Sequence, residues 1–198
     1  MTRAYTAIVA SVVVMLSFAA PVAAGTYEDA GRAYARGDYE TAARLFRSLA
    51  EQGDAVAQER LGSMYHEGEG VVRDYAEALK WYRLAADQGD PSAQNNLAVM
   101  YYNGQGVPQD FAEAFKWYRL AAEQGNTIAQ SNLGSMYAKG QGLSVDVVLA
   151  HMWFNLAAAK GEPEAAKTRD MIASHMTAAE IAEAQKLARE WKPNKRVP

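Results

Sequence analysis

The sequence predicts an all-α solenoid made of helix–loop–helix repeats, and three observations support this. Consecutive segments of 36 residues, 54–89, 90–125 and 126–161, align without insertions, and a period of 20–50 residues is typical of solenoids. Within each segment, apolar residues recur at helical spacing. Glycines and capping residues stand at the ends of each expected helix. A single helix pair cannot bury its apolar stripe, so neighbouring pairs must stack.

The first helix of a repeat is seen most clearly in the second copy. Asp90 can cap a helix that begins at Pro91, because proline at the first position loses no hydrogen bond. Gly104 and Gly106 then end this helix, since glycine accepts a left-handed backbone. The apolar positions between these signals form one helical stripe: Ala93, Leu97, Met100 and Tyr101.

The second helix of the same repeat begins after Asp110 and ends at Gly125. Its apolar stripe consists of Ala114, Trp117, Tyr118 and Ala121. The corresponding aspartates Asp74 and Asp146 recur in the other copies, so we interpret them as helix caps and not as a single active site. The large rings of Trp81, Trp117 and Trp153 are expected to fill the space between helix layers.

Two incomplete units flank the three full repeats. Residues 25–53 match the same positions with a shorter loop between the helices. Residues 162–198 are degenerate, because Arg169 stands where Leu97 would align. Thr177 and Glu180 form a capping box before a last helix that is apolar on one face and polar on the other. The sequence therefore predicts a C-terminal helical cap over residues 162–198.

The first 24 residues have the pattern of a secretory signal peptide. Arg3 is the only charge before Glu28, an apolar run covers residues 7–18, and small residues precede Gly25. We expect cleavage after Ala24, a periplasmic or secreted protein, and no stable membrane insertion after cleavage. An uncleaved membrane anchor is the alternative, although the apolar run is shorter than the roughly 20 residues of a membrane span.

Composition excludes several classes of function. The chain has 198 residues, 20 Lys+Arg, 23 Asp+Glu and no Cys, with a formal net charge of −3. This charge argues against a nucleic-acid binder driven by phosphate attraction. The lack of cysteine excludes disulfides, cysteine-ligated zinc, iron–sulfur clusters and a thiol nucleophile. With 49% hydrophobic residues the chain is typical of a globular protein.

The sequence predicts no catalytic residue, no metal site and no cofactor. The histidines His66, His151 and His175 lack partners at metal-binding spacing. The Gly-x-Gly loops connect helix to helix and lack the lysine of a phosphate-binding loop. Ser63 and Ser135 stand in Gly-Ser-Met and not in the Gly-x-Ser-x-Gly of a nucleophile elbow.

The positions that vary between copies are the candidates for recognition, because the constant positions pack the framework. Tyr102 is the best candidate anchor, as an exposed aromatic outside the apolar stripe, and Asn95 and Asn103 could bond a peptide backbone. An ordinary solvated helix face is the alternative interpretation. The candidate partner-binding residues on the first helices are Arg32, Arg36, Glu59, Ser63, His66, Asn95, Val99, Tyr102, Asn103, Ser131, Ser135 and Lys139.

The pattern A-x3-LGxMYxxGxGVxxDxxxAxxWYxxAAxxG at residues 57–89, echoed at 93–125, resembles the Sel1-like repeat, a 36-residue relative of the tetratricopeptide repeat. The first unit, residues 25–53, resembles a tetratricopeptide repeat itself. The resemblance implies a right-handed superhelix whose first helices line a concave surface. It also implies a scaffold or regulator that holds other proteins. One exported branch of the family is associated with penicillin binding, but it carries a cysteine pair in each repeat, which this chain lacks.

We therefore expect a non-enzymatic interaction scaffold or regulator in the periplasm. Its expected partner is an envelope protein or peptide segment held in the concave groove formed by the first helices. Two alternatives stay open. One is an enzyme acting on cell wall or β-lactams, which would need a nucleophile with a positioned base. The other is a glycan-binding envelope scaffold.

Overall fold

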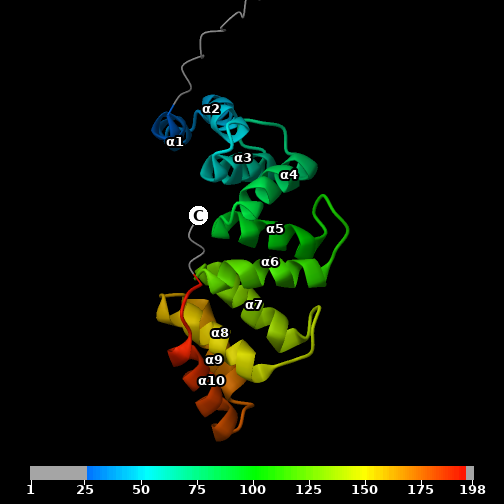
Figure 1. Cartoon of the computed structure of the whole chain (residues 1–198), viewed down its shortest axis with the longest axis vertical. Helices are drawn as coiled ribbons and strands as arrows, with labels where there is room; N and C mark the ends of the chain where they lie inside the picture. Colours follow the sequence, from blue (N-terminus) through cyan, green and yellow to red (C-terminus); the bar gives the residue numbers. More distant parts are fainter. Residues whose placement is uncertain (1–25, 195–198) are drawn as a thin grey trace, which may run out of the picture.

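The computed structural model describes residues 26–194, so the expected signal peptide lies outside the described residues. Within 26–194 the chain forms α-helices and no strand (Figure 1). Among these helices, none is both long and apolar enough to cross a membrane. The helices are α1 (Tyr27–Ala35), α2 (Tyr39–Glu51), α3 (Ala55–Glu67), α4 (Tyr75–Asp87), α5 (Pro91–Asn103), α6 (Phe111–Glu123), α7 (Thr127–Lys139), α8 (Val147–Ala159), α9 (Pro163–Ala173) and α10 (Ala178–Glu190).

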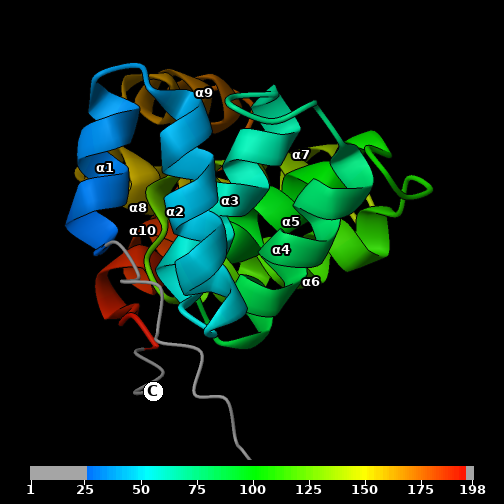
Figure 2. The same ribbon diagram turned by 90° about the horizontal axis from the view of Figure 1, so that it is seen from above.

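The helices pack in the order of the chain, as a solenoid requires. In each of the first four pairs the first helix packs on the second, and the second packs on the first helix of the next unit. The last two helices, α9 and α10, both pack on α8. Figure 1 shows the resulting elongated stack, and Figure 2 shows that the stack turns, so that α8–α10 lie behind α1 and α2. The predicted all-α solenoid is confirmed.

The helix ends follow the predicted capping chemistry. The side chain of Asp90 accepts a hydrogen bond from the backbone N–H of Ala93 at 2.7 Å, and Asp110 accepts from Ala112 and Glu113 at 2.9 and 3.0 Å. The same caps recur at Asp54, Asp74, Asn126 and Asp146. Gly104 ends α5 in the left-handed conformation with φ 69°.

The second glycine of each Gly-x-Gly loop joins neighbouring repeats. A Cβ placed on Gly106 would lie 2.8 Å from the carbonyl oxygen of Tyr75, at the start of the previous second helix. Gly142 has the same relation to Phe111, at 2.8 Å. The loop therefore rests directly on backbone of the preceding repeat, and only glycine fits there.

The core repeats with the sequence. Leu61, Leu97 and Leu133 are 0% exposed, and the methionines Met64, Met100 and Met136 lie beside them in the buried clusters. Trp81 and Trp153 are buried as expected, whereas Trp117 is only partly buried. The tryptophan positions are thus not equivalent, although their sequence context is.

A row of buried glutamines, which the sequence analysis did not identify, also connects the repeats. The side-chain amides of Gln58, Gln94 and Gln130 donate to backbone carbonyls of the preceding second helix at 3.0–3.2 Å. Gln88 then donates to the Oε1 atom of Gln58 at 2.7 Å, and Gln124 to that of Gln94 at 2.8 Å. We call these residues the glutamine ladder. The hydrogen bond to its last member, Gln130, is missing, because Lys160 stands at the position equivalent to Gln124. The buried Oε1 atom of Gln130 therefore has no partner within the described chain.

The C-terminal cap is formed by α9 and α10, of which α10 packs on α8. The predicted capping box is present, with Thr177 and Glu180 bonding each other's backbone. Trp191 meets Trp153 edge to face, with ring centroids 6.1 Å apart. Beyond α10, the backbone N–H of Asn194 donates to the carbonyl oxygen of Glu123 at 2.7 Å, which ties this segment to the end of α6.

Candidate functional site

The side chains of the first helices border a row of cavities, one at each junction between neighbouring repeats. Each cavity is lined by an aromatic ring from a second helix, and these rings stand 36 residues apart. From the N-terminal end, the cavities involve Phe46 (about 240 Å³), Tyr82 (about 200 Å³), Tyr118 (about 140 Å³) and Phe154 (about 270 Å³). We call the surface formed by these cavities the recognition face.

Small residues of the first helices make room for these rings. A Cβ on Gly62 would lie 2.7 Å from the ring of Tyr82, and a Cβ on Gly134 would lie 3.0 Å from the ring of Phe154. The Leu-Gly pair of the sequence pattern thus places the aromatic residue under the recognition face. A larger residue at Gly62 would displace the ring that lines the cavity.

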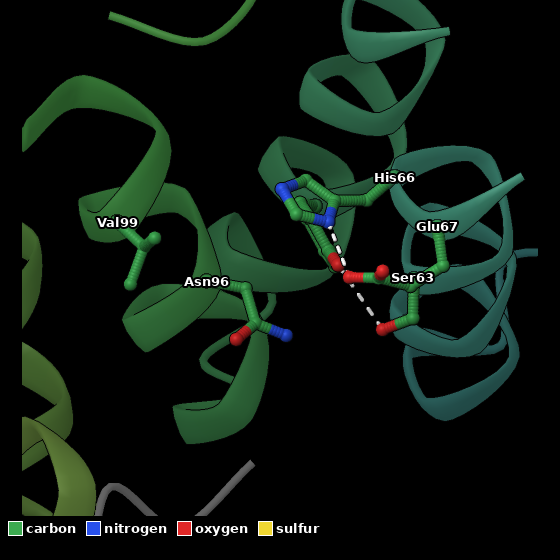
Figure 3. A pocket seen from close by; sticks show the side chains of 6 residues that line it. Ser63, His66, Glu67, Asn96 and Val99 are labelled. Carbon is green, nitrogen blue, oxygen red and sulfur yellow. Dashed lines mark hydrogen bonds and ion pairs between the residues drawn. The ribbon is translucent and has the colours of Figure 1, made fainter. Parts of the chain in front are cut away.

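Most of the side chains that line the cavity between α3 and α5 carry a polar group (Figure 3). Ser63 donates to the Oε1 atom of Glu59 at 3.2 Å and accepts from the hydroxyl of Tyr82 at 3.1 Å. The Nδ1 atom of His66 lies 2.7 Å from the carboxylate of Glu67. Figure 3 shows Asn96 and Val99 of α5 on the opposite side. Asn96 was not among the predicted residues.

A continuous chain of hydrogen-bonded side chains runs along α7, α5 and α3. Asn132 donates to Asn95 at 3.3 Å, Asn95 to Asn96 at 3.2 Å, and Asn96 to the carboxylate of Glu59 at 3.0 Å. We call it the asparagine chain. Asn96 and Asn132 occupy equivalent positions in consecutive repeats, and each donates to a side chain of the preceding repeat. This position of the first helix therefore makes the contact between repeats.

Glu59 and Asn95 are more buried than expected for residues on an open face. They are 8% and 6% exposed. Burial raises the pKa of the Glu59 carboxyl, while Arg60, Ser63 and Asn96 oppose this shift. Because both residues belong to the asparagine chain, they orient the partly exposed amides of Asn96 and Asn132.

Tyr102 also differs from the expected exposed aromatic. Its ring is partly buried and meets Phe111 edge to face at 5.2 Å, and its hydroxyl donates to the Oε1 atom of Gln141 at 2.9 Å. Tyr102 therefore connects α5 to the loop of the next repeat, while it still lines the cavity between α5 and α7. The other residues that line this cavity are Tyr118, Asn132, Ser135 and Lys139.

In the two outer cavities the aromatic ring of the second helix is a phenylalanine, Phe46 or Phe154, and not a tyrosine. At the N-terminal end, Tyr27, Tyr34 and Arg60 surround the cavity above Phe46. The hydrogen bond that the Tyr34 hydroxyl donates to Glu69, at 2.6 Å, raises the pKa of Tyr34 to about 12. The predicted Arg32 and Arg36 are exposed and do not line this cavity, and Arg32 pairs with Asp29.

At the C-terminal end, the cavity lies between α7 and α9, and we call it the α7–α9 cavity. It includes the predicted Ser131 and Ser135. The residues that the sequence did not identify there are Ile128, Asn132, Phe154, Glu162, Glu164, Ala165 and Thr168. Asn103, another predicted residue, is exposed at the end of α5 and lines none of the four cavities.

The recognition face provides hydrogen-bonding groups and shape but no activated nucleophile. Ser63 is bonded to Glu59 and Tyr82, whereas His66 contacts Glu67 and Gln105. Triad chemistry requires the base to bond the nucleophile. Over residues 26–194, no group of three or more His, Asp or Glu side chains is placed to hold a metal ion.

The repeats match a known family along most of the chain. The Sel1 repeat family model matches residues 25–54, 55–90, 91–126 and 127–162. The crystal structure of a Sel1 repeat protein from Oxalobacter formigenes is 42% identical with a TM-score of 0.59, and the match covers 63% of this chain and 94% of that one. A protective antigen of uropathogenic Escherichia coli strains that displays the SLR fold is 28% identical with a TM-score of 0.59. That match covers 76% of this chain and 40% of the antigen. No curated protein matches the chain.

Proposed function

Because the chain belongs to the Sel1 repeat family, we propose that it is a non-enzymatic scaffold or regulator that binds a segment of a partner protein along its recognition face. Sel1 repeat proteins generally mediate protein–protein interactions, and the family is typically a non-enzymatic scaffold. The signal peptide expected over residues 1–24 supports a periplasmic location, and with it a partner from the cell envelope.

The row of four cavities is the observation that carries this proposal. Each cavity, at 140–270 Å³, is smaller than a typical small-molecule pocket of roughly 300–1,000 Å³. One cavity can therefore take a single side chain but not a whole ligand. Because the cavities recur at every repeat junction, a chain molecule that places successive side chains in them matches the face better than a compact ligand does.

The asparagine chain supports a peptide as that chain molecule. Each asparagine side chain has two N–H donors, and the bonds along the chain use one donor each of Asn95, Asn96 and Asn132. The second donor of the partly exposed Asn96 and Asn132 is left for a backbone carbonyl of the partner. Since the neighbouring repeats already fix these amides, little side-chain entropy is lost on binding.

Capture of a partner on the immobilised chain tests the proposal. Envelope extract is passed over the native chain, over a Val99→Arg/Ser135→Arg variant that fills two cavities, and over a Lys80→Ala/Lys116→Ala control on the outer helix face. Thermal melting checks that all three are folded. We expect a partner that the native and control chains retain and the cavity variant loses. Equal retention by all three would exclude the recognition face as the binding site.

A glycan is the second candidate ligand, and one feature favours it. Tyr27 and Tyr34 are 38% and 39% exposed beside the cavity above Phe46, and exposed aromatic rings can stack on sugar rings. A ligand that binds the native state must raise the melting temperature. Soluble wall or capsule fragments should therefore raise it in the native chain and not in a Tyr27→Ala/Tyr34→Ala variant.

A further inference from the structure

The α7–α9 cavity differs in charge from the other three. Its lining contains the carboxylates of Glu162 and Glu164 and no lysine or arginine. By contrast, Arg60 lines the cavity above Phe46, Lys139 lines the cavity above Tyr118, and His66 stands beside Glu67 above Tyr82. The cavity above Tyr82 holds one carboxylate, that of Glu67, so the α7–α9 cavity with its two carboxylates is the most acidic part of the recognition face.

Apolar groups line the same cavity next to these carboxylates. Phe154 and Ala165 are 3% and 2% exposed, whereas Ile128 is 59% exposed at the cavity edge. A lysine or arginine side chain has this dual character, because its methylene stem packs on apolar surface while its head group stays at a polar rim. The volume of about 270 Å³ leaves room for such a side chain.

Polar groups of the cavity also lack partners within the described chain. The Oγ atom of Ser131 is buried and has none. Glu162 precedes α9 but makes no capping bond, unlike Asp54, Asp90 and Asn126 in front of the other first helices. Glu164 pairs with Lys167 through one oxygen, and both side chains are more than 70% exposed, so this pair contributes little. The carboxylates are therefore available to a second cation.

The start of α9 is also the positive end of a helix dipole, which favours anions. This end is equivalent to roughly half a positive charge and Lys167 adds one, whereas the two glutamates bring two negative charges. The sum favours a cation. We propose that the α7–α9 cavity binds a lysine or arginine side chain of the partner segment. The assignment rests on the proposed function, and it adds the sign of the partner's charge at this end of the groove.

A small-molecule probe tests the assignment separately from partner capture. Nα-acetyl-lysine N-methylamide is titrated into the isotope-labelled chain, with the uncharged norleucine analogue as the control probe. We expect NMR shifts at Ile128, Ser131 and Ala165 with the lysine probe. We expect at least fivefold weaker binding of that probe to the Glu162→Gln/Glu164→Gln variant, and unchanged binding to Glu113→Gln, which alters a carboxylate on the outer face of α6.

Several results would overturn the assignment. Equal shifts with the norleucine probe would show an apolar pocket without charge selection. No shifts with either probe, while partner capture succeeds, would reject the cation site and leave the proposed function standing. Shifts with the lysine probe, while capture fails, would support the cation site and reject the protein partner.

Other occupants of the cavity are distinguished without a probe. Lys195 and Arg196 make the end of this chain basic, so shifts at Ile128 and Ser131 on truncation after Asn194 would assign the cavity to the chain's own end. Dependence of the same signals on protein concentration would assign it to a second copy. Either result would overturn the assignment to a partner.

Discussion

The helices α6 and α8 are equivalent in consecutive repeats, yet the outer face of α6 is charged and exposed whereas that of α8 is apolar and covered. On α6, Glu113 and Lys116 form an exposed ion pair, as Glu77 and Lys80 do on α4. On α8 the same positions carry Leu149 and Met152, and Met152 is only 6% exposed. The cause is α10, which packs on α8 and on no equivalent helix of the central repeats.

This comparison separates two reasons for a position to vary between repeats. Lys116 and Met152 differ because one faces solvent and the other faces the cap. Val99 and Ser135 also differ, but both are partly exposed and line cavities of the recognition face. Variation alone is therefore insufficient evidence of recognition, and a variable position becomes a binding candidate only when no other element packs on it.

The largest expected effect is the loss of the tryptophan beneath the cap. Trp153→Ala should lower the free energy of unfolding by about 3–5 kcal/mol, because Trp153 is 7% exposed and packs against Trp191. The substitution Trp117→Ala should lower the free energy of unfolding less, by about 2–3 kcal/mol, because Trp117 is only partly buried. Denaturant unfolding measures both. Equal losses would contradict the idea that the cap adds to the burial of Trp153.

Exchanging the outer residues of α6 and α8 tests the comparison directly. Met152→Lys should cost about 3 kcal/mol or more, because it places an unpaired charge beneath α10. Lys116→Met should change stability by no more than about 0.5 kcal/mol, since the site is exposed. Urea unfolding of the two variants and the native chain measures both changes in the free energy of unfolding. A small loss in Met152→Lys would mean that α10 does not stay on α8 in solution.

The buried histidine of α8 should make the capped repeat sensitive to acid. His151 is 3% exposed, and its Nδ1 atom has no partner within residues 26–194. Burial lowers its pKa from the ordinary value of 6.5, Arg169 lowers it further, and Asp170 opposes the shift. The unfolded chain then binds a proton at a higher pH than the folded chain does. The stability contribution is complete above pH 6.5 and is lost as the pH falls toward the lowered pKa.

The substitution His151→Phe isolates this contribution, because Phe115 occupies the equivalent position on α6. Melting temperatures between pH 7.5 and 5 should fall more steeply for the native chain than for the variant. Glu59→Gln serves as a control of opposite sign. Burial raises the pKa of Glu59, so this residue favours folding less as the pH rises. Parallel pH profiles of the native chain and His151→Phe would contradict the prediction.

The sequence was sufficient to predict features that depend on residues close together in the chain. Asp90, Asp110 and Gly104 act at their own helix ends, and the capping box of Thr177 needs only Glu180. Because the local signals repeat, the solenoid follows from them. The C-terminal cap was predictable for the same reason, since its polar face and its capping box lie within one segment.

The sequence did not show which side chains meet across repeats. Asn96 reaches Glu59, and Tyr102 reaches Gln141, over separations of 37 and 39 residues. These contacts depend on the rotation between helix pairs, which no single repeat encodes. They bury Glu59 and Asn95 and partly cover Tyr102, residues that the sequence pattern alone places on an open face. The acidic lining of the α7–α9 cavity was missed because Glu162 and Glu164 lie in the degenerate unit.

The smallest expected effect concerns the complete and incomplete parts of the glutamine ladder. Gln124→Ala should cost about 1–2 kcal/mol, because it leaves the buried Oε1 atom of Gln94 without its donor. At the equivalent position, Lys160→Ala removes no donor from Gln130, whose Oε1 atom already lacks one. It removes the hydrogen bond from the ammonium group to the exposed carbonyl oxygen of Gly125 and its contact with the ring of Trp191, which together are worth about 0.5–1 kcal/mol at an exposed site. Urea unfolding should therefore show the larger loss for Gln124→Ala. A larger loss for Lys160→Ala would mean that the cap, and not the ladder, determines stability at these turns.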